Sequence, residues 1–104
     1  MTRVAGFATL LMLSTAAVVA QPIGDPRKGA ELAMETCSRC HAVRGGAPIS
    51  PNLRAPTFTE LASAPGMTVA ALMVALTTPH AGMPMFMLSQ DQREDIIAYI
   101  LSLK

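Results

Sequence analysis

The sequence predicts an all-α domain, and three observations support that prediction. Apolar residues recur at helical spacing in several segments, most clearly at Ile96, Ile97 and Ile100. Residues that commonly cap helices stand directly before these segments. No segment shows the alternation of apolar and polar residues that is typical of a half-buried strand. We therefore expect three to four helices and no sheet.

The first expected helix covers residues 26 to 36. Asp25 offers a side-chain oxygen as N-cap, and Pro26 suits the first helical position. Gly29 lies inside this helix, where glycine costs about 1 kcal/mol relative to alanine. We therefore expect another backbone to pass close to Gly29.

Helix-breaking residues divide the middle of the chain. Residues 44 to 56 contain two glycines and three prolines, so they should form a loop. A short helix is expected at residues 58 to 63, and a third helix should begin after Thr68 and end at Pro79. Residues 78 to 88 carry two prolines and a glycine and should form a second irregular loop.

The last expected helix has the clearest start. Ser89 and Gln92 form a capping-box pattern, and Asp91 complements the positive end of the helix dipole. The isoleucine stripe described above follows at once, with Tyr99 at its border. This helix should supply much of the core.

The start of the chain is typical of a signal peptide. Arg3 precedes an apolar stretch, and small residues lead up to Ala20. We expect residues 1–20 to be cleaved, which leaves residues 21–104 as a single exported, periplasmic domain. An uncleaved membrane anchor is the alternative, although the apolar run is at the short limit for a spanning helix.

Charge is balanced beyond Arg3, with seven basic and seven acidic residues. This balance argues against a nucleic-acid surface or a polybasic membrane patch. We therefore expect no nucleic-acid partner and no stable membrane insertion after cleavage. Aromatic residues are scarce, and so small a domain should need a further body to complete its core.

Residues 37 to 41 form the C-x-x-C-H pattern of c-type haem attachment. Cys37 and Cys40 can each add to a vinyl group of one haem, and His41 can then bind the iron. A disulfide, a thioredoxin-like redox pair and a zinc site are the alternatives. The redox pair lacks its usual βαβ context, and adjacent Cys40 and His41 cannot easily both reach one tetrahedral zinc together with Cys37.

The loop at residues 80 to 88 offers donors for the other face of the iron. Met83 is favoured because Gly82 permits close backbone approach and Pro84 fixes the backbone beyond it. Met85 and Met87 are expected to line the pocket. These two methionines, His80 or an open site remain alternatives, and His80 is more simply explained as a surface histidine beside a propionate or in solvent. The sequence offers Arg54, Asn52 and Thr57 as possible propionate partners.

Taken together, these segments resemble a class I monohaem cytochrome c of the small bacterial periplasmic kind. The resemblance rests on the first helix with Gly29, the motif at residues 37 to 41, the Met83-Pro84-Met85-Phe86 run and the terminal helix, and it spans residues 25 to 104. It implies helices wrapped around one covalent haem c. Two features depart from the family pattern: Ala33 stands where an aromatic is common, and tryptophan is absent.

The resemblance implies specific roles. Cys37 and Cys40 would carry the thioethers, while His41 and Met83 would be the iron's axial ligands. The carbonyl of Pro51 would accept the imidazole N–H of His41 and orient its ring. Gly29 would let the first helix cross the last near Tyr99.

The expected function is that of a periplasmic one-electron carrier rather than an enzyme. Its partners would be redox proteins such as a dehydrogenase or an oxidase, with the chain acting as a monomer or as a dedicated cytochrome subunit of a dehydrogenase complex. A haem enzyme or gas sensor with an open or displaceable sixth site is the competing class.

Overall fold

The structure is a computed structural model that describes Met1, residues 14–17 and residues 23–104. The expected cleavage point after Ala20, and most of the expected signal peptide, lie outside these residues. Within the described part the chain is helical and contains no strand, which confirms the all-α prediction. None of the described helices is long and apolar enough to cross a membrane.

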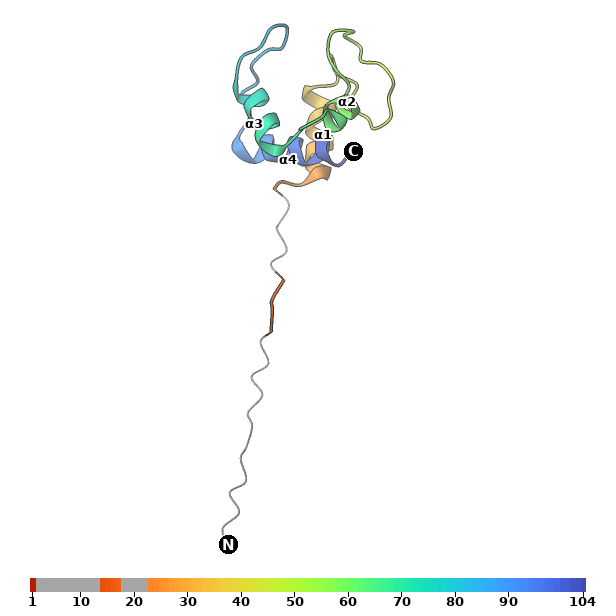
Figure 1. Ribbon diagram of the computed structural model, residues 1–104. Coiled ribbons are helices and arrows are strands. Elements are labelled where there is room, and N and C mark those ends of the chain that lie inside the picture. Colours follow the sequence, from red (N-terminus) through yellow and green to blue (C-terminus); the bar gives the residue numbers. More distant parts are fainter. Residues whose placement is uncertain (2–13, 18–22) are drawn as a thin grey trace.

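Four helices follow one another along the described part of the chain (Figure 1). They are α1 (Pro26–Thr36), α2 (Phe58–Ser63), α3 (Val69–Thr77) and α4 (Gln90–Leu101). Each lies where the sequence predicts it. The two expected loops rise on either side of the helices in Figure 1, one between α1 and α2 and the other between α3 and α4.

Each helix begins at a side chain that accepts a hydrogen bond from the first turn. Asp25 accepts from the Arg27 backbone N–H at 2.9 Å. The Thr57 and Ser89 side chains belong to complete capping boxes at the starts of α2 and α4, and Thr68 caps α3. Because these bonds are local, the sequence fixes the helix starts without help from tertiary contacts.

Helix α4 is the centre of the domain, since α1, α2 and α3 all pack against it. Ile96 and Ile97 are its most deeply buried side chains. They join a core made of Ala33, Cys37, Val43, Phe58, Ala62, Leu72 and Ile100. The core therefore includes one cysteine of the motif at residues 37 to 41.

Helix α1 crosses α4 at Gly29. A Cβ atom placed there would collide with the carbonyl oxygen of Asp95 and lie 2.9 Å from Tyr99 Cβ. The backbone N–H of Asp25 also donates to Asp95 Oδ1 at 2.7 Å. The expected close approach at Gly29 is confirmed, and the start of α1 is fastened to α4 beside it.

Candidate functional site

The candidate site is a cavity of about 570 Å³ that is lined by residues of both loops. Three segments contribute to it: the end of α1 with the motif, the second half of the loop before α2, and the loop after α3. Its lining residues include Cys37, Arg39, Cys40, His41, Asn52, Arg54, Pro56, His80, Met83 and Phe86. The volume is within the usual range for a small-molecule or cofactor site.

The motif is positioned by a turn that continues directly from α1. The N–H of Cys37 donates to the Ala33 carbonyl at 2.8 Å, and the N–H groups of Cys40 and His41 donate to the Cys37 carbonyl at 3.2 and 3.0 Å. Ala33 is fully buried against the rest of the core. The packing of α1 on α4 therefore sets where both thiols and the imidazole lie.

Both cysteines are free thiols, so the disulfide alternative is not realised in this structure. Cys37 is buried, and desolvation raises the pKa of its thiol from 9.0 to about 11. Cys40 is partly exposed. The zinc alternative gains no support either, because among the described residues no three His, Cys, Asp or Glu side chains gather as a metal site.

The carbonyl that faces His41 belongs to Pro56, so the prediction of Pro51 is wrong. His41 Nδ1 lies 2.7 Å from the Pro56 carbonyl oxygen, which can only accept a hydrogen bond. The N–H of Asn52 donates to the Cys40 carbonyl at 3.1 Å, and that of Ala55 donates to the Asn52 carbonyl at 2.9 Å. The first bond ties residue 52, directly after Pro51, to the backbone of Cys40. The second belongs to the turn that follows, and after this turn the carbonyl of Pro56 reaches His41.

This hydrogen bond determines which nitrogen of His41 is free. Since Nδ1 donates to Pro56, Nε2 holds the lone pair of the neutral ring. A carbonyl acceptor on the first nitrogen makes the second a better metal ligand. In this arrangement His41 can act as a metal ligand through Nε2.

The His41 imidazole packs against the Phe58 ring, which in turn packs against the Tyr99 ring. The His41 and Phe58 rings are 5.6 Å apart between centroids, and the Phe58 and Tyr99 rings are 6.2 Å apart, both in tilted arrangements. The Tyr99 hydroxyl donates to the Val43 carbonyl at 2.6 Å. Helix α4 thus holds the segment that follows the motif in place.

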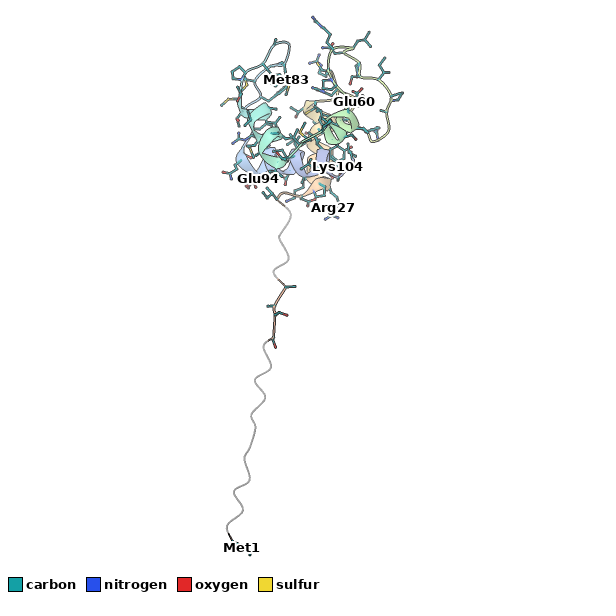
Figure 2. The ribbon with its side chains drawn as sticks, viewed as in Figure 1. Met1, Arg27, Glu60, Met83, Glu94 and Lys104 are labelled. Carbon is teal, nitrogen blue, oxygen red and sulfur yellow. The ribbon has the colours of Figure 1, made fainter. Side chains whose placement is uncertain are left out.

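The loop after α3 brings two further donor groups to the cavity, His80 and Met83. The N–H of Met83 donates to the His80 carbonyl at 3.3 Å, which closes a tight turn with Gly82 at φ +80°. His80 Nε2 lies 3.1 Å from Met83 Sδ. Figure 2 shows Met83 on this loop, on the side of the domain opposite to Arg27 near the start of α1.

Met85 and Met87 do not line the cavity, contrary to expectation. Met87 is fully exposed and Met85 is half-exposed, whereas Phe86 between them contributes to the lining. Phe86 is the one aromatic residue of this loop, and that composition was the signal that could have singled it out.

Asn52 and Arg54 line the cavity, as expected, and so does Arg39, which no sequence pattern had singled out. Thr57, also offered by the sequence, does not line the cavity, and its buried side chain accepts from the Glu60 N–H in the cap of α2. The lining thus combines two thiols, two imidazoles, a thioether, apolar side chains and two guanidinium groups. That donor set fits an iron porphyrin with anionic propionates, and the cavity has room for a cofactor.

Comparison with known proteins agrees with this geometry. The profile of the family described as "Cytochrome c" matches residues 26–104. Over 80 residues, covering 77% of this chain and 76% of the relative, the sequence is 38% identical to cytochrome c-552 of Bradyrhizobium diazoefficiens. No significant match was found among solved structures.

Proposed function

This chain belongs to the cytochrome c family, and from that premise we propose that it is a periplasmic one-electron carrier with His/Met axial ligation. Its all-α fold is that of a class I monohaem cytochrome c, and its cofactor is one covalent haem c. Such a haem supplies reversible one-electron exchange between ferric and ferrous iron. The protein's task is to hold, orient and shield the group.

In this proposal Cys37 and Cys40 form the two thioether links, and His41 Nε2 and Met83 Sδ are the axial ligands. The observation that carries it is that one cavity is lined by all four side chains, although Met83 is about forty residues beyond the motif. A thioether ligand favours the ferrous state relative to a second imidazole and so raises the reduction potential.

The surrounding residues supply orientation and a dry environment. The Pro56 carbonyl fixes the His41 ring and increases the basicity of Nε2. Phe58 packs behind that ring, and Phe86 covers part of the cavity. Arg39 and Arg54 would bind the propionates, since a guanidinium matches a carboxylate in charge and geometry.

None of these roles requires an acid, a base or a nucleophile, and members of this family typically carry electrons. We therefore propose that the chain has no catalytic activity of its own. We also propose that residues 21–104 are exported to the periplasm, because the start of the sequence is typical of a signal peptide. Haem attachment and contact with redox partners would both take place there.

The proposed docking surface is an apolar patch beside the cavity, made of Ala81, Met85 and Met87. All three residues are exposed, and Met87 is fully so. Because charge beyond Arg3 is balanced and the patch carries none, docking to a dehydrogenase or oxidase would depend on apolar contact more than on electrostatic steering.

The test is spectroscopy of the haem-loaded chain, produced together with a haem-maturation system. Ferric wild-type protein should show the weak far-red band of a sulfur axial ligand and should be reduced reversibly by one electron. Met83→Ala should remove the band. Met85→Ala is the matched control, since it removes a neighbouring methionine outside the cavity and should keep the band.

A high-spin wild-type protein that binds CO at once would contradict the proposal. The sixth position would then be open, and a gas sensor or haem enzyme would account better for the chain. Loss of the band in Met85→Ala but not in Met83→Ala would contradict the assignment of the ligand.

A further inference from the structure

His80 and Met83 present two donor atoms to the same cavity. Their Nε2 and Sδ atoms are 3.1 Å apart, and both residues line the cavity together with His41. The turn that joins them, with its Met83 N–H to His80 carbonyl bond of 3.3 Å, brings the two side chains together. The proposed function uses only Met83, which leaves His80 without a role.

A second contact of His80 determines which of its nitrogens is free. Nδ1 lies 3.2 Å from the Thr78 carbonyl oxygen, which can only accept. In the neutral ring Nδ1 therefore carries the proton and Nε2 presents a lone pair. His41 makes the same arrangement with Pro56 at 2.7 Å. A histidine whose other nitrogen donates to a backbone carbonyl is prepared for metal ligation.

In this tautomer neither Nε2 of His80 nor Sδ of Met83 carries a hydrogen, so no hydrogen bond joins them. In this tautomer both residues offer a lone pair at the cavity that they line, so either one, but not both at once, could occupy the sixth position of the iron. The alternative is that Nε2 is protonated and donates to the sulfur, which would make His80 a support for Met83 rather than a ligand. These two roles predict different behaviour when Met83 is removed.

We infer that His80 is a reserve axial ligand that binds the iron through Nε2 when Met83 is absent or displaced. The inference rests on the proposed function, in which Met83 is the resident ligand. In the exchange the bond from Met83 Sδ to iron breaks and a bond from His80 Nε2 forms. No electron is transferred, and in the tautomer with the proton on Nδ1 no proton has to move.

Burial explains why Met83 holds the position first. Met83 is partly buried, whereas His80 is exposed and would have to move inward. Both residues stand on the same tight turn beside the cavity, so the movement is confined to that loop. An imidazole in place of the thioether lowers the reduction potential. Loss of Met83 would therefore leave a six-coordinate haem of lower reduction potential instead of a haem with an open sixth position.

The experiment compares four haem-loaded proteins: wild type, His80→Ala, Met83→Ala and the double variant. Ferric spectra report the spin state and the sulfur band, and CO binding to the ferrous form reports an open sixth position. Wild type and His80→Ala should both show the sulfur band. Met83→Ala should lack the band but stay low-spin, while the double variant should be high-spin.

CO binding gives the same comparison in a second measurement. Because CO binds only the fraction of molecules whose sixth position is open, Met83→Ala should bind it at least roughly tenfold more weakly than the double variant. Added imidazole should convert the double variant to the spectrum of Met83→Ala, which shows that its haem site is intact.

Two outcomes separate the inference from the proposed function. If Met83→Ala is high-spin and binds CO like the double variant, His80 is not a reserve ligand, and the sulfur band of wild type still supports the proposed ligation. If wild type itself lacks the sulfur band, Met83 is not the resident ligand, and both the proposed ligation and the inference fail.

Discussion

Gly29 of α1 and Asp95 of α4 are in direct backbone contact, with no space between them for a side chain. The Cβ atom of an alanine at residue 29 would overlap the Asp95 carbonyl oxygen. Since that oxygen belongs to the backbone of α4, it can move only if the helix moves. The same helix carries Tyr99, whose hydroxyl holds the Val43 carbonyl beyond the motif. This crossing therefore connects fold stability to the geometry of the site.

Gly29→Ala should destabilise the haem-loaded protein. The gain in helix propensity is about 1 kcal/mol, but the overlap forces α1 away from α4 and should leave a net loss of roughly 1–3 kcal/mol in the free energy of unfolding. Denaturant titration followed by circular dichroism measures it. Lys28→Ala is the control, because Lys28 directly precedes Gly29 in α1 and is exposed, and it should change the free energy of unfolding little. Equal stability of the two variants would show that the crossing is looser than described.

Tyr99→Phe should cost about 1–2 kcal/mol of unfolding free energy, because the Val43 carbonyl loses its partner at a buried residue. The ring contact with Phe58 is kept in this variant. Tyr99→Ala removes both and should cost more, roughly 3–5 kcal/mol. The same denaturant titration compares them. A Phe variant as stable as wild type would mean that water or another donor serves the Val43 carbonyl.

The helices could be predicted from the sequence because the signals that start them are local. The caps at Asp25, Thr57, Thr68 and Ser89 bond within their own first turns, so no tertiary contact is needed to recognise them. The contact at Gly29 was also predictable, since an interior helix glycine is costly unless space requires it.

The site was less predictable where loops set the geometry. The choice between Pro51 and Pro56 depends on how residues 52 to 55 turn back, and no periodic pattern encodes that path. The approach of His80 to Met83 likewise depends on a turn with Gly82 at positive φ. The sequence supplied both donors and the glycine, but the turn decides that the donors converge.

The buried thiol of Cys37 makes the haem-free chain sensitive to alkaline pH. Its pKa is raised to about 11 by burial, whereas the unfolded chain has the ordinary value of 9.0. Below pH 9 the thiol is neutral in both states, and its burial is fully compatible with folding. As pH rises toward 11 the unfolded chain gains a thiolate first, so stability should fall across this range.

Thermal unfolding of the haem-free chain between pH 8 and pH 11, followed by circular dichroism, measures the effect. Cys37→Ala is the control, because it has no thiol to ionise at that position and should lose less stability over the same interval. An identical pH dependence of the two chains, or a haem-free chain without a cooperative unfolding transition, would indicate that Cys37 is not buried before haem attachment.

The apolar patch of Ala81, Met85 and Met87 can be tested through electron self-exchange between ferric and ferrous copies of this protein. Both partners then present the same nearly neutral surface, so the wild-type rate should depend only weakly on ionic strength. Met87→Lys places a charge on the patch of both partners. It should slow exchange roughly two- to tenfold at low salt, with partial recovery as salt screens the repulsion.

Val74→Lys adds the same charge on the exposed face of α3, outside the cavity lining, and should leave the rate nearly unchanged. If both lysine variants slow exchange equally, net charge and not the patch controls the encounter. A wild-type rate that depends strongly on salt would likewise exclude apolar docking, because contact between uncharged side chains is not screened by ions.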